Sequence, residues 1–233
     1  MRNIAGALFL CLAAAHAAEP GKIRIQLVTG GHSHDISFYE IFSGNREYQL
    51  TVNPHPSAFR FDLVDRFDVL VLYDLAEVEA EKDRAILRRF VESGKGVVAL
   101  HHALGSNQQW PWWYEEVIGG KYFMRPEGKH PASTYKHDVP LTINVVKKHP
   151  VTAGVDRFPI VDEIYGRLWL SPKIDVLLET SHPESDGVVG WISPYAKSRV
   201  VYLQLGHGRE ALENPNYRKL VHNAIAWAAG RQR

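Results

Sequence analysis

Short apolar runs, bounded by glycine, proline or polar residues, recur along most of the chain. Several of these runs are unbroken by polar residues, which is typical of parallel strands that are buried on both faces. The pattern predicts strands at residues 23–28, 48–52, 69–72, 96–100, 176–178, 188–192 and 200–205.

Two longer stretches between or after these runs have the periodicity of amphipathic helices. Residues 80–93 place Ile86, Leu87, Phe90 and Val91 on one helical face and are followed by Gly94, and residues 216–229 repeat this pattern before Gly230. Because strands alternate with helices, the chain is predicted to have an α/β fold with a mostly parallel sheet.

Residues 120–175 differ from the rest in being richer in proline, glycine and charge, with a short strand predicted at 141–146. No linker-like stretch bounds this region. We therefore expect an insertion or cap over the sheet rather than a separate domain, so that residues 18–233 form one domain.

The N-terminus has the pattern of a secretory signal peptide. A basic start at Arg2 precedes an apolar run and an Ala-His-Ala site, which predicts cleavage after Ala17 and leaves residues 1–17 as the signal. The run is too short to span a membrane, so we expect a periplasmic or secreted protein without stable membrane insertion. Cys11 is the only cysteine, and its loss with the signal excludes disulfides and thiolate chemistry from the mature chain.

Charge excludes one class of partner. Without Arg2, 26 basic residues face 26 acidic ones, and no basic stripe is visible. We therefore expect no nucleic-acid partner, and the oligomeric state stays open.

Histidines and acids follow three of the predicted strands and one further β-like run. His32 and His34 follow Gly30 and Gly31, the pair 101–102 follows strand 96–100, His207 follows strand 200–205, and Asp162-Glu163 follows the β-like run 158–161. Ligand sites of open α/β sheets lie at the carboxyl ends of the strands, so these side chains are expected to converge. The alternative for each is an ordinary loop histidine.

We predict His101, Glu163 and His207 as catalytic residues, because imidazole and carboxylate suit proton transfer near neutral pH. Adjacent residues point in different directions, so only His101 of the pair 101–102 is expected to face the site. His32 and His34, with His207 and Glu163, are candidate ligands for a divalent metal such as zinc; metal-free chemistry is the alternative. Gly206 begins a G-x-G-x-x-A match, but it follows the last strand, and neither NAD nor flavin is expected.

Residues 110–114 form an aromatic cluster, Trp-Pro-Trp-Trp-Tyr, after the His101 loop. Aromatic faces stack on sugars but also fill cores, so one or two of these rings are expected to meet a ligand. The polar loop 181–186 is interpreted as a solvated turn.

Six segments together resemble the ThuA-like (trehalose utilisation) family: residues 28–32, 100–103, 149–154, 162–165, 190–191 and 205–207. The resemblance implies a three-layer, flavodoxin-like doubly wound sheet like that of class I glutamine amidotransferases. It implies no amidotransferase activity, because the region of His101 takes the place of the reactive cysteine. It also implies a small carbohydrate as ligand, and we expect His102, Trp112, Tyr165 and Trp191 to contact it.

The family resemblance links the chain to disaccharide breakdown through 3-keto-glycosides. A 3-keto group makes the neighbouring C–H acidic, so His101 or His207 as base, Glu163 as acid, and a metal or histidine that polarises the carbonyl would suffice. We therefore expect a hydrolase, lyase or isomerase that acts on a sugar by acid/base or metal-assisted chemistry. A non-catalytic sugar-binding protein is the alternative from another class. Hydrolysis of an unoxidised glycoside needs two carboxylates flanking one bond, and only Glu163, with Asp162 beside it, is clearly placed.

Overall fold

A single mixed sheet organises the computed structural model, which describes residue 19 and residues 21–231. Its nine strands lie in the order β2-β1-β3-β4-β11-β10-β9-β6-β7, and β5 and β8 form a separate small pair. The strands are β1 (Ile23–Gly30), β2 (Tyr48–Pro54), β3 (Val69–Asp74), β4 (Gly96–Leu100), β5 (Gly120–Lys121), β6 (Thr134–Val145), β7 (Phe158–Gly166), β8 (Trp169–Leu170), β9 (Asp175–Thr180), β10 (Val188–Ile192) and β11 (Val200–Leu203).

The helices are mostly short. The α-helices are α1 (Glu81–Glu92), α2 (Arg209–Glu213) and α3 (Pro215–Ala228), the 3-10 helices are η1 (Ile36–Ile41), η2 (Ser57–Phe59), η3 (His101–Gly105) and η5 (Pro150–Thr152), and η4 (Trp112–Ile118) is a π-helix. The two long α-helices and all strands predicted from the apolar pattern are present, with ends shifted by a few residues, and the predicted strand 141–146 forms only the end of the longer β6.

The sheet has a parallel part and an antiparallel part. Strands β2, β1, β3, β4 and β11 pair parallel with one another, as the buried apolar runs of β3, β4 and β11 predict. Strands β10, β9, β6 and β7 then continue the sheet with antiparallel pairing. The doubly wound α/β prediction is thus confirmed for the part that carries β1, β3, β4 and β11.

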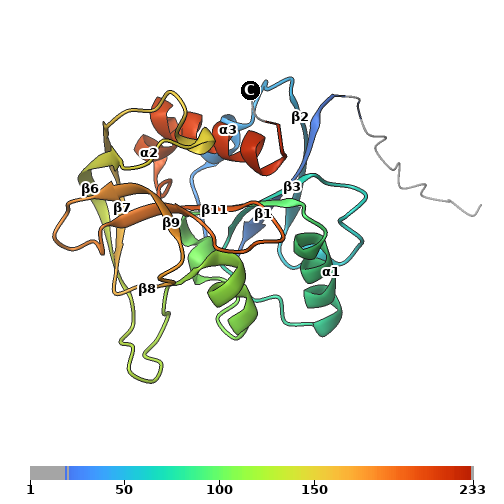
Figure 1. The fold of residues 1–233 in the computed structure, drawn as a ribbon, viewed down its shortest axis with the longest axis horizontal. Helices are drawn as coiled ribbons and strands as arrows, with labels where there is room; N and C mark the ends of the chain where they lie inside the picture. Colours follow the sequence, from blue (N-terminus) through green and yellow to red (C-terminus); the bar gives the residue numbers. More distant parts are fainter. Residues whose placement is uncertain (1–18, 20, 232–233) are drawn as a thin grey trace, which may run out of the picture.

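Two apolar cores cover the two faces of the sheet and make a three-layer structure (Figure 1). Alternate residues of each central strand enter opposite cores, as in β4, where Val98 faces one core and Val97 the other. Helix α3 packs with Leu220 and Ile225 in the first core, whereas α1 packs with Phe90 in the second.

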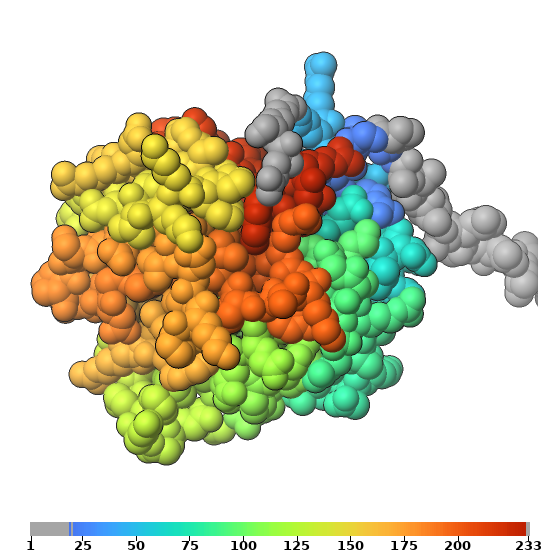
Figure 2. Space-filling view, in the orientation of Figure 1, coloured from blue at the N-terminus to red at the C-terminus, as the bar shows by residue number. Residues whose placement is uncertain are grey.

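The expectation of a cap at residues 120–175 is wrong for most of that region. Its two long strands, β6 and β7, pair with each other and extend the main sheet through β9. The buried side chains Leu141 and Ile143 join the first core and so connect this edge of the sheet to it. Only the hairpin between β5 and β6 protrudes, seen in yellow-green at the lower left of Figures 1 and 2.

Within the described residues, no helix is long and apolar enough to cross a membrane. The predicted signal peptide, residues 1–17 with Cys11, lies outside the described residues.

Candidate functional site

Two side chains that follow β4 and β11 meet one side chain from within β7 at the sheet's carboxyl edge. His101 comes directly after β4, His207 comes four residues after β11, and Glu163 lies within β7. His101 Nε2 lies 3.0 Å from Glu163 Oε2 and 3.0 Å from His207 Nδ1. His207 Nδ1 lies 3.4 Å from the same Glu163 oxygen. The three predicted catalytic residues therefore form a closed triangle, which we call the His–Glu–His triangle.

His101 is held in a conformation that non-glycine residues seldom adopt. Its φ is +48°, in the left-handed region, where β4 turns sharply into η3. Strain of this kind concentrates at functional sites, where surrounding bonds hold it. Here the Tyr202 hydroxyl donates to the His101 carbonyl at 2.8 Å, and His101 Nδ1 lies 2.7 Å from the Gln204 carbonyl. A carbonyl only accepts, so His101 carries its proton on Nδ1 and presents Nε2 to the triangle.

Gly206 and Asp162 fix the backbone turn that places His207 in the His–Glu–His triangle. Gly206 has a φ of +112°, and a Cβ at this position would lie 2.2 Å from the Tyr217 hydroxyl, so only glycine fits. The buried Asp162 carboxylate accepts from the Gly206 N–H at 2.7 Å and from the His207 N–H at 2.9 Å. Gly208 has an ordinary φ of −115°, so the turn depends on Gly206 alone.

Electrostatics keep Glu163 ionised and His207 neutral near pH 7. Burial raises the pKa of Glu163, but the hydrogen bond and charge of His101, together with His207 and His137, bring it below its usual value. Burial, followed by the charge of His101, lowers the pKa of His207 to about 4. The triangle thus holds a carboxylate and an uncharged imidazole around His101 Nε2.

His137 is a site residue that the sequence reasoning missed. A β-bulge sets His137 and Asp138 against Glu163, between the pairs Lys136↔Ile164 and Val139↔Asp162. Asp138 has a φ of +54°, and the bulge brings His137 Nδ1 to 3.1 Å from Glu163 Oε1. No run of apolar residues marks this part of β6, so the sequence pattern gives no sign of it.

The remaining predicted histidines lie near the triangle without joining it. His102 is buried against Tyr73, and burial lowers its pKa to about 2. His32 is exposed, and its ring lies tilted against that of His102, with ring centroids 4.8 Å apart. His34 Nε2 instead lies 3.2 Å from the Tyr39 hydroxyl. Among the described residues, the group whose donor atoms are spaced for a metal is His101, Glu163 and His207.

A cavity of about 260 Å³ opens beside the triangle. Tyr165 borders it, with its hydroxyl 3.2 Å from His101 Nε2. The other residues around it are His32, Leu75, His101, His102, Gly105, Tyr122, Met124, Tyr135, His137 and Glu163. Three tyrosines and several polar groups around a space of this size suit a single sugar ring.

The two predicted tryptophans are not part of this cavity. Trp191 is fully buried in the second core, and its indole N–H donates to the Ile118 carbonyl at 2.8 Å. Trp112 packs outside the same core with the Arg88 guanidinium 4.1 Å from its ring centroid. Of the residues expected to contact a sugar, His102 and Tyr165 border the cavity, whereas Trp112 and Trp191 stabilise the fold.

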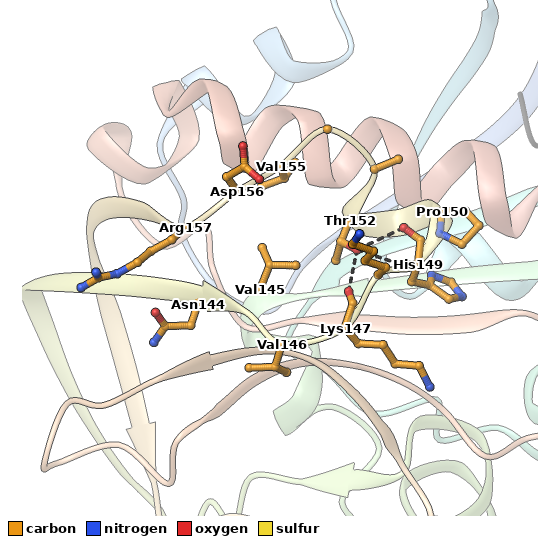
Figure 3. A pocket seen from close by; sticks show the side chains of 13 residues that line it. Asn144, Val145, Val146, Lys147, His149, Pro150, Thr152, Val155, Asp156 and Arg157 are labelled. Carbon is orange, nitrogen blue, oxygen red and sulfur yellow. Dashed lines mark hydrogen bonds between the residues drawn. The ribbon is translucent and has the colours of Figure 1, made fainter.

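A larger hollow, of about 800 Å³, lies along residues 144–157 (Figure 3). One segment of the chain lines it, and the side chains of Thr152 and His149 bond within that segment. Thr152 donates to the Lys147 carbonyl, and His149 Nδ1 accepts from the Val151 N–H. The motif at 149–154 is therefore a helix cap that shapes η5, not part of the reactive centre.

Comparisons with known proteins agree with this architecture. Two ThuA-like proteins of known structure are similar: one from Parabacteroides merdae (TM-score 0.75, 19% identity, 91% of each chain covered) and one from Bacteroides uniformis (TM-score 0.70, 18% identity, 94% of this chain and 96% of the other). A chain of PurLQS from Thermotoga maritima shares the class I glutamine amidotransferase-like fold (TM-score 0.60, 15% identity, 88% of this chain and 99% of the other). No curated protein matches the sequence. The ThuA family model, described as trehalose utilisation, matches residues 25–228, and the chain belongs to this family.

Proposed function

We propose that the chain is a carbohydrate-processing enzyme that acts on a keto-sugar as a lyase or isomerase. The observation that carries the proposal is the convergence of His101, Glu163 and His207 beside a tyrosine-lined cavity of one sugar ring's size. The family's description, trehalose utilisation, supports a carbohydrate as the ligand.

The His–Glu–His triangle acts as the electrophilic centre in this proposal. The Gln204 carbonyl fixes one proton of His101 on Nδ1, and His101 Nε2 lies 3.0 Å from an ionised oxygen of Glu163. A positive charge, either a proton or a cation, is required at this point. Such a charge stabilises the oxyanion that forms when a carbonyl compound loses a neighbouring proton.

His137 is the group placed to move that proton. Its side chain is 48% exposed, borders the cavity and is oriented through Nδ1 by Glu163. With a 3-keto-glycoside, His137 takes the proton from C2 and the electron pair passes to the carbonyl oxygen, which gives an enolate. When the carbonyl re-forms, this pair makes a C1=C2 double bond, the C1–O bond breaks, and the leaving oxygen takes the proton held by His137. This assignment differs from the sequence-based one because His101 and Glu163 are buried and bound to each other.

The test is turnover of 4-nitrophenyl 3-keto-glucoside against unoxidised 4-nitrophenyl glucoside, followed by nitrophenolate release. We expect turnover of the keto substrate alone, and a loss of at least about 100-fold in kcat/KM in His207→Ala and His137→Ala. His182→Ala, in the loop 181–186, serves as the matched histidine control. Full activity in His207→Ala would refute the role of the triangle.

The alternative is a sugar-binding protein without catalysis, favoured by the tyrosines Tyr122, Tyr135 and Tyr165 around the cavity. It predicts that the keto-sugar binds without product formation and that the histidine variants change only affinity. Calorimetry of binding, run beside the turnover assay, separates the two functions.

We also propose that the protein works outside the cytoplasm, periplasmic or secreted. Residues 1–17 have the pattern of a cleaved signal peptide, which supports this location. N-terminal sequencing of the protein recovered from the native host would test it; an intact Met1 in the cytoplasmic fraction would refute it.

A further inference from the structure

Three donor atoms of the site have the mutual spacing of ligands on one metal ion. His101 Nε2, Glu163 Oε2 and His207 Nδ1 are separated by 3.0, 3.0 and 3.4 Å. Ligands about 2.1 Å from an ion, at tetrahedral or octahedral angles, lie about 3.0 to 3.4 Å from one another. We propose that His101, Glu163 and His207 bind a divalent first-row transition metal ion through these three atoms. The inference rests on the same site as the proposed function and identifies the charge at its centre.

Hydrogen bonding alone does not satisfy these atoms. The proton of His101 is on Nδ1, toward the Gln204 carbonyl, so its Nε2 lone pair faces both Glu163 and His207. A second proton on His101 can point to only one of these two partners. The Tyr165 hydroxyl, 3.2 Å from Nε2, has a single proton to give. One cation accepts all three lone pairs at once.

The groups around the triangle match those that support metal ligands. A ligating histidine usually donates its other ring N–H to a carbonyl or carboxylate, as His101 does to Gln204 at 2.7 Å. His137 binds the other oxygen of Glu163 at 3.1 Å, which leaves one carboxylate oxygen for the ion. Asp162 fixes the backbone of His207. Each ligand is therefore oriented before an ion arrives.

Burial and donor chemistry limit the class of ion. The side chains of His101 and Glu163 are 1% and 6% exposed, whereas that of His207 is 24% exposed, so the triangle has one open side. Two nitrogens and one carboxylate oxygen suit Zn²⁺, Fe²⁺, Co²⁺ or Mn²⁺ rather than Ca²⁺ or Mg²⁺, which favour all-oxygen sites. The open side leaves coordination positions for a sugar carbonyl or water.

The site proposed here differs from the one predicted from sequence, which combined His32 and His34 with His207 and Glu163. His34 bonds to Tyr39 and packs on Phe38, away from the triangle. The two ligand sets therefore make opposite predictions for His34, and one pair of variants decides between them.

The experiment uses the full-length chain, purified without chelator for elemental analysis and then stripped with dipicolinate. We expect about one zinc, iron, cobalt or manganese ion per chain, and tight rebinding of Zn²⁺ or Mn²⁺ by calorimetry. His207→Ala and Glu163→Ala should weaken binding at least about 100-fold, and His137→Ala about 10-fold. His34→Ala and His182→Ala should bind as the wild type does.

His101 is fully buried, whereas His207 is partly exposed, so His207→Ala decides the result if a His101 variant fails to fold. Absence of a transition metal with no binding of Zn²⁺ or Mn²⁺, or loss of binding in His34→Ala but not in His207→Ala, overturns the inference. Keto-sugar turnover that persists in the stripped protein also overturns it while leaving the proposed function intact. Metal binding without any turnover leaves the metal site intact and refutes the function.

Discussion

Replacing Asp162 by asparagine tests how the turn that carries His207 is held. The carboxylate accepts three backbone N–H groups: Gly206 at 2.7 Å, Glu163 at 2.8 Å and His207 at 2.9 Å. The residue is 3% exposed, so water cannot replace a lost acceptor. Asp162→Asn keeps the size of the side chain and changes only its charge and one of its two acceptors.

The magnitude follows from these three bonds. The amide nitrogen must face at least one N–H, and an unsatisfied buried donor costs about 1–3 kcal/mol. The hydrogen bonds that the asparagine would still accept are weaker than those to a charged carboxylate, by on the order of 1 kcal/mol in total. Burial raises the pKa of Asp162, so the neutral amide recovers part of this cost. We expect the free energy of unfolding to fall by about 2 kcal/mol.

The assay is urea unfolding at pH 7, monitored by tryptophan fluorescence, with Asp156→Asn as the control. Asp156 is exposed, and its variant should stay within about 0.5 kcal/mol of the wild type. We also expect keto-sugar turnover to fall in Asp162→Asn, because the backbone of His207 loses its anchor. A change below about 0.5 kcal/mol with full activity would refute the reasoning about this turn.

Three further predictions concern stability and ligand binding. Burial raises the pKa of Asp68, but hydrogen bonds from Arg24 and Lys95 lower it to about 2. Its contribution to stability is therefore complete above about pH 4 and is lost as the pH falls from about 4 to about 2. Between pH 7 and pH 2.5, the free energy of unfolding in urea should fall by about 1 kcal/mol less in Asp68→Asn than in the wild type, and identical pH profiles would contradict this prediction. Gly206→Ala should lower the free energy of unfolding by about 3 kcal/mol or more, because φ is +112° and the new Cβ would clash with the Tyr217 hydroxyl. Gly208→Ala has open space around its Cβ and should change the free energy of unfolding by less than about 1 kcal/mol. Equal effects of the two variants would argue against the turn described. Trp191→Phe should lower the free energy of unfolding by about 1–3 kcal/mol, because the buried Ile118 carbonyl loses its hydrogen bond. The affinity for the sugar, measured by calorimetry, should not change. Weaker sugar binding by the folded variant would show that Trp191 does contact the ligand.

The sequence by itself determined the central strands, the two long helices and the three catalytic candidates. The unbroken apolar runs of β3, β4 and β11 mark buried parallel strands, and the carboxyl ends of such strands lie at one edge of the sheet. His101 and His207 follow directly from that rule. Glu163 was predicted from the apolar run before it and from the family resemblance.

Tertiary structure decided the rest. Strands β6 and β7 pair antiparallel across a long hairpin with a bulge, and neither the pairing nor the bulge that brings His137 to Glu163 leaves a periodic signal in the sequence. Whether Trp191 fills a core or meets a ligand depends on what packs against it, since an aromatic ring suits both. Hydrophobic periodicity specifies which face of a segment is buried, but only the folded chain specifies which distant side chains that burial brings together.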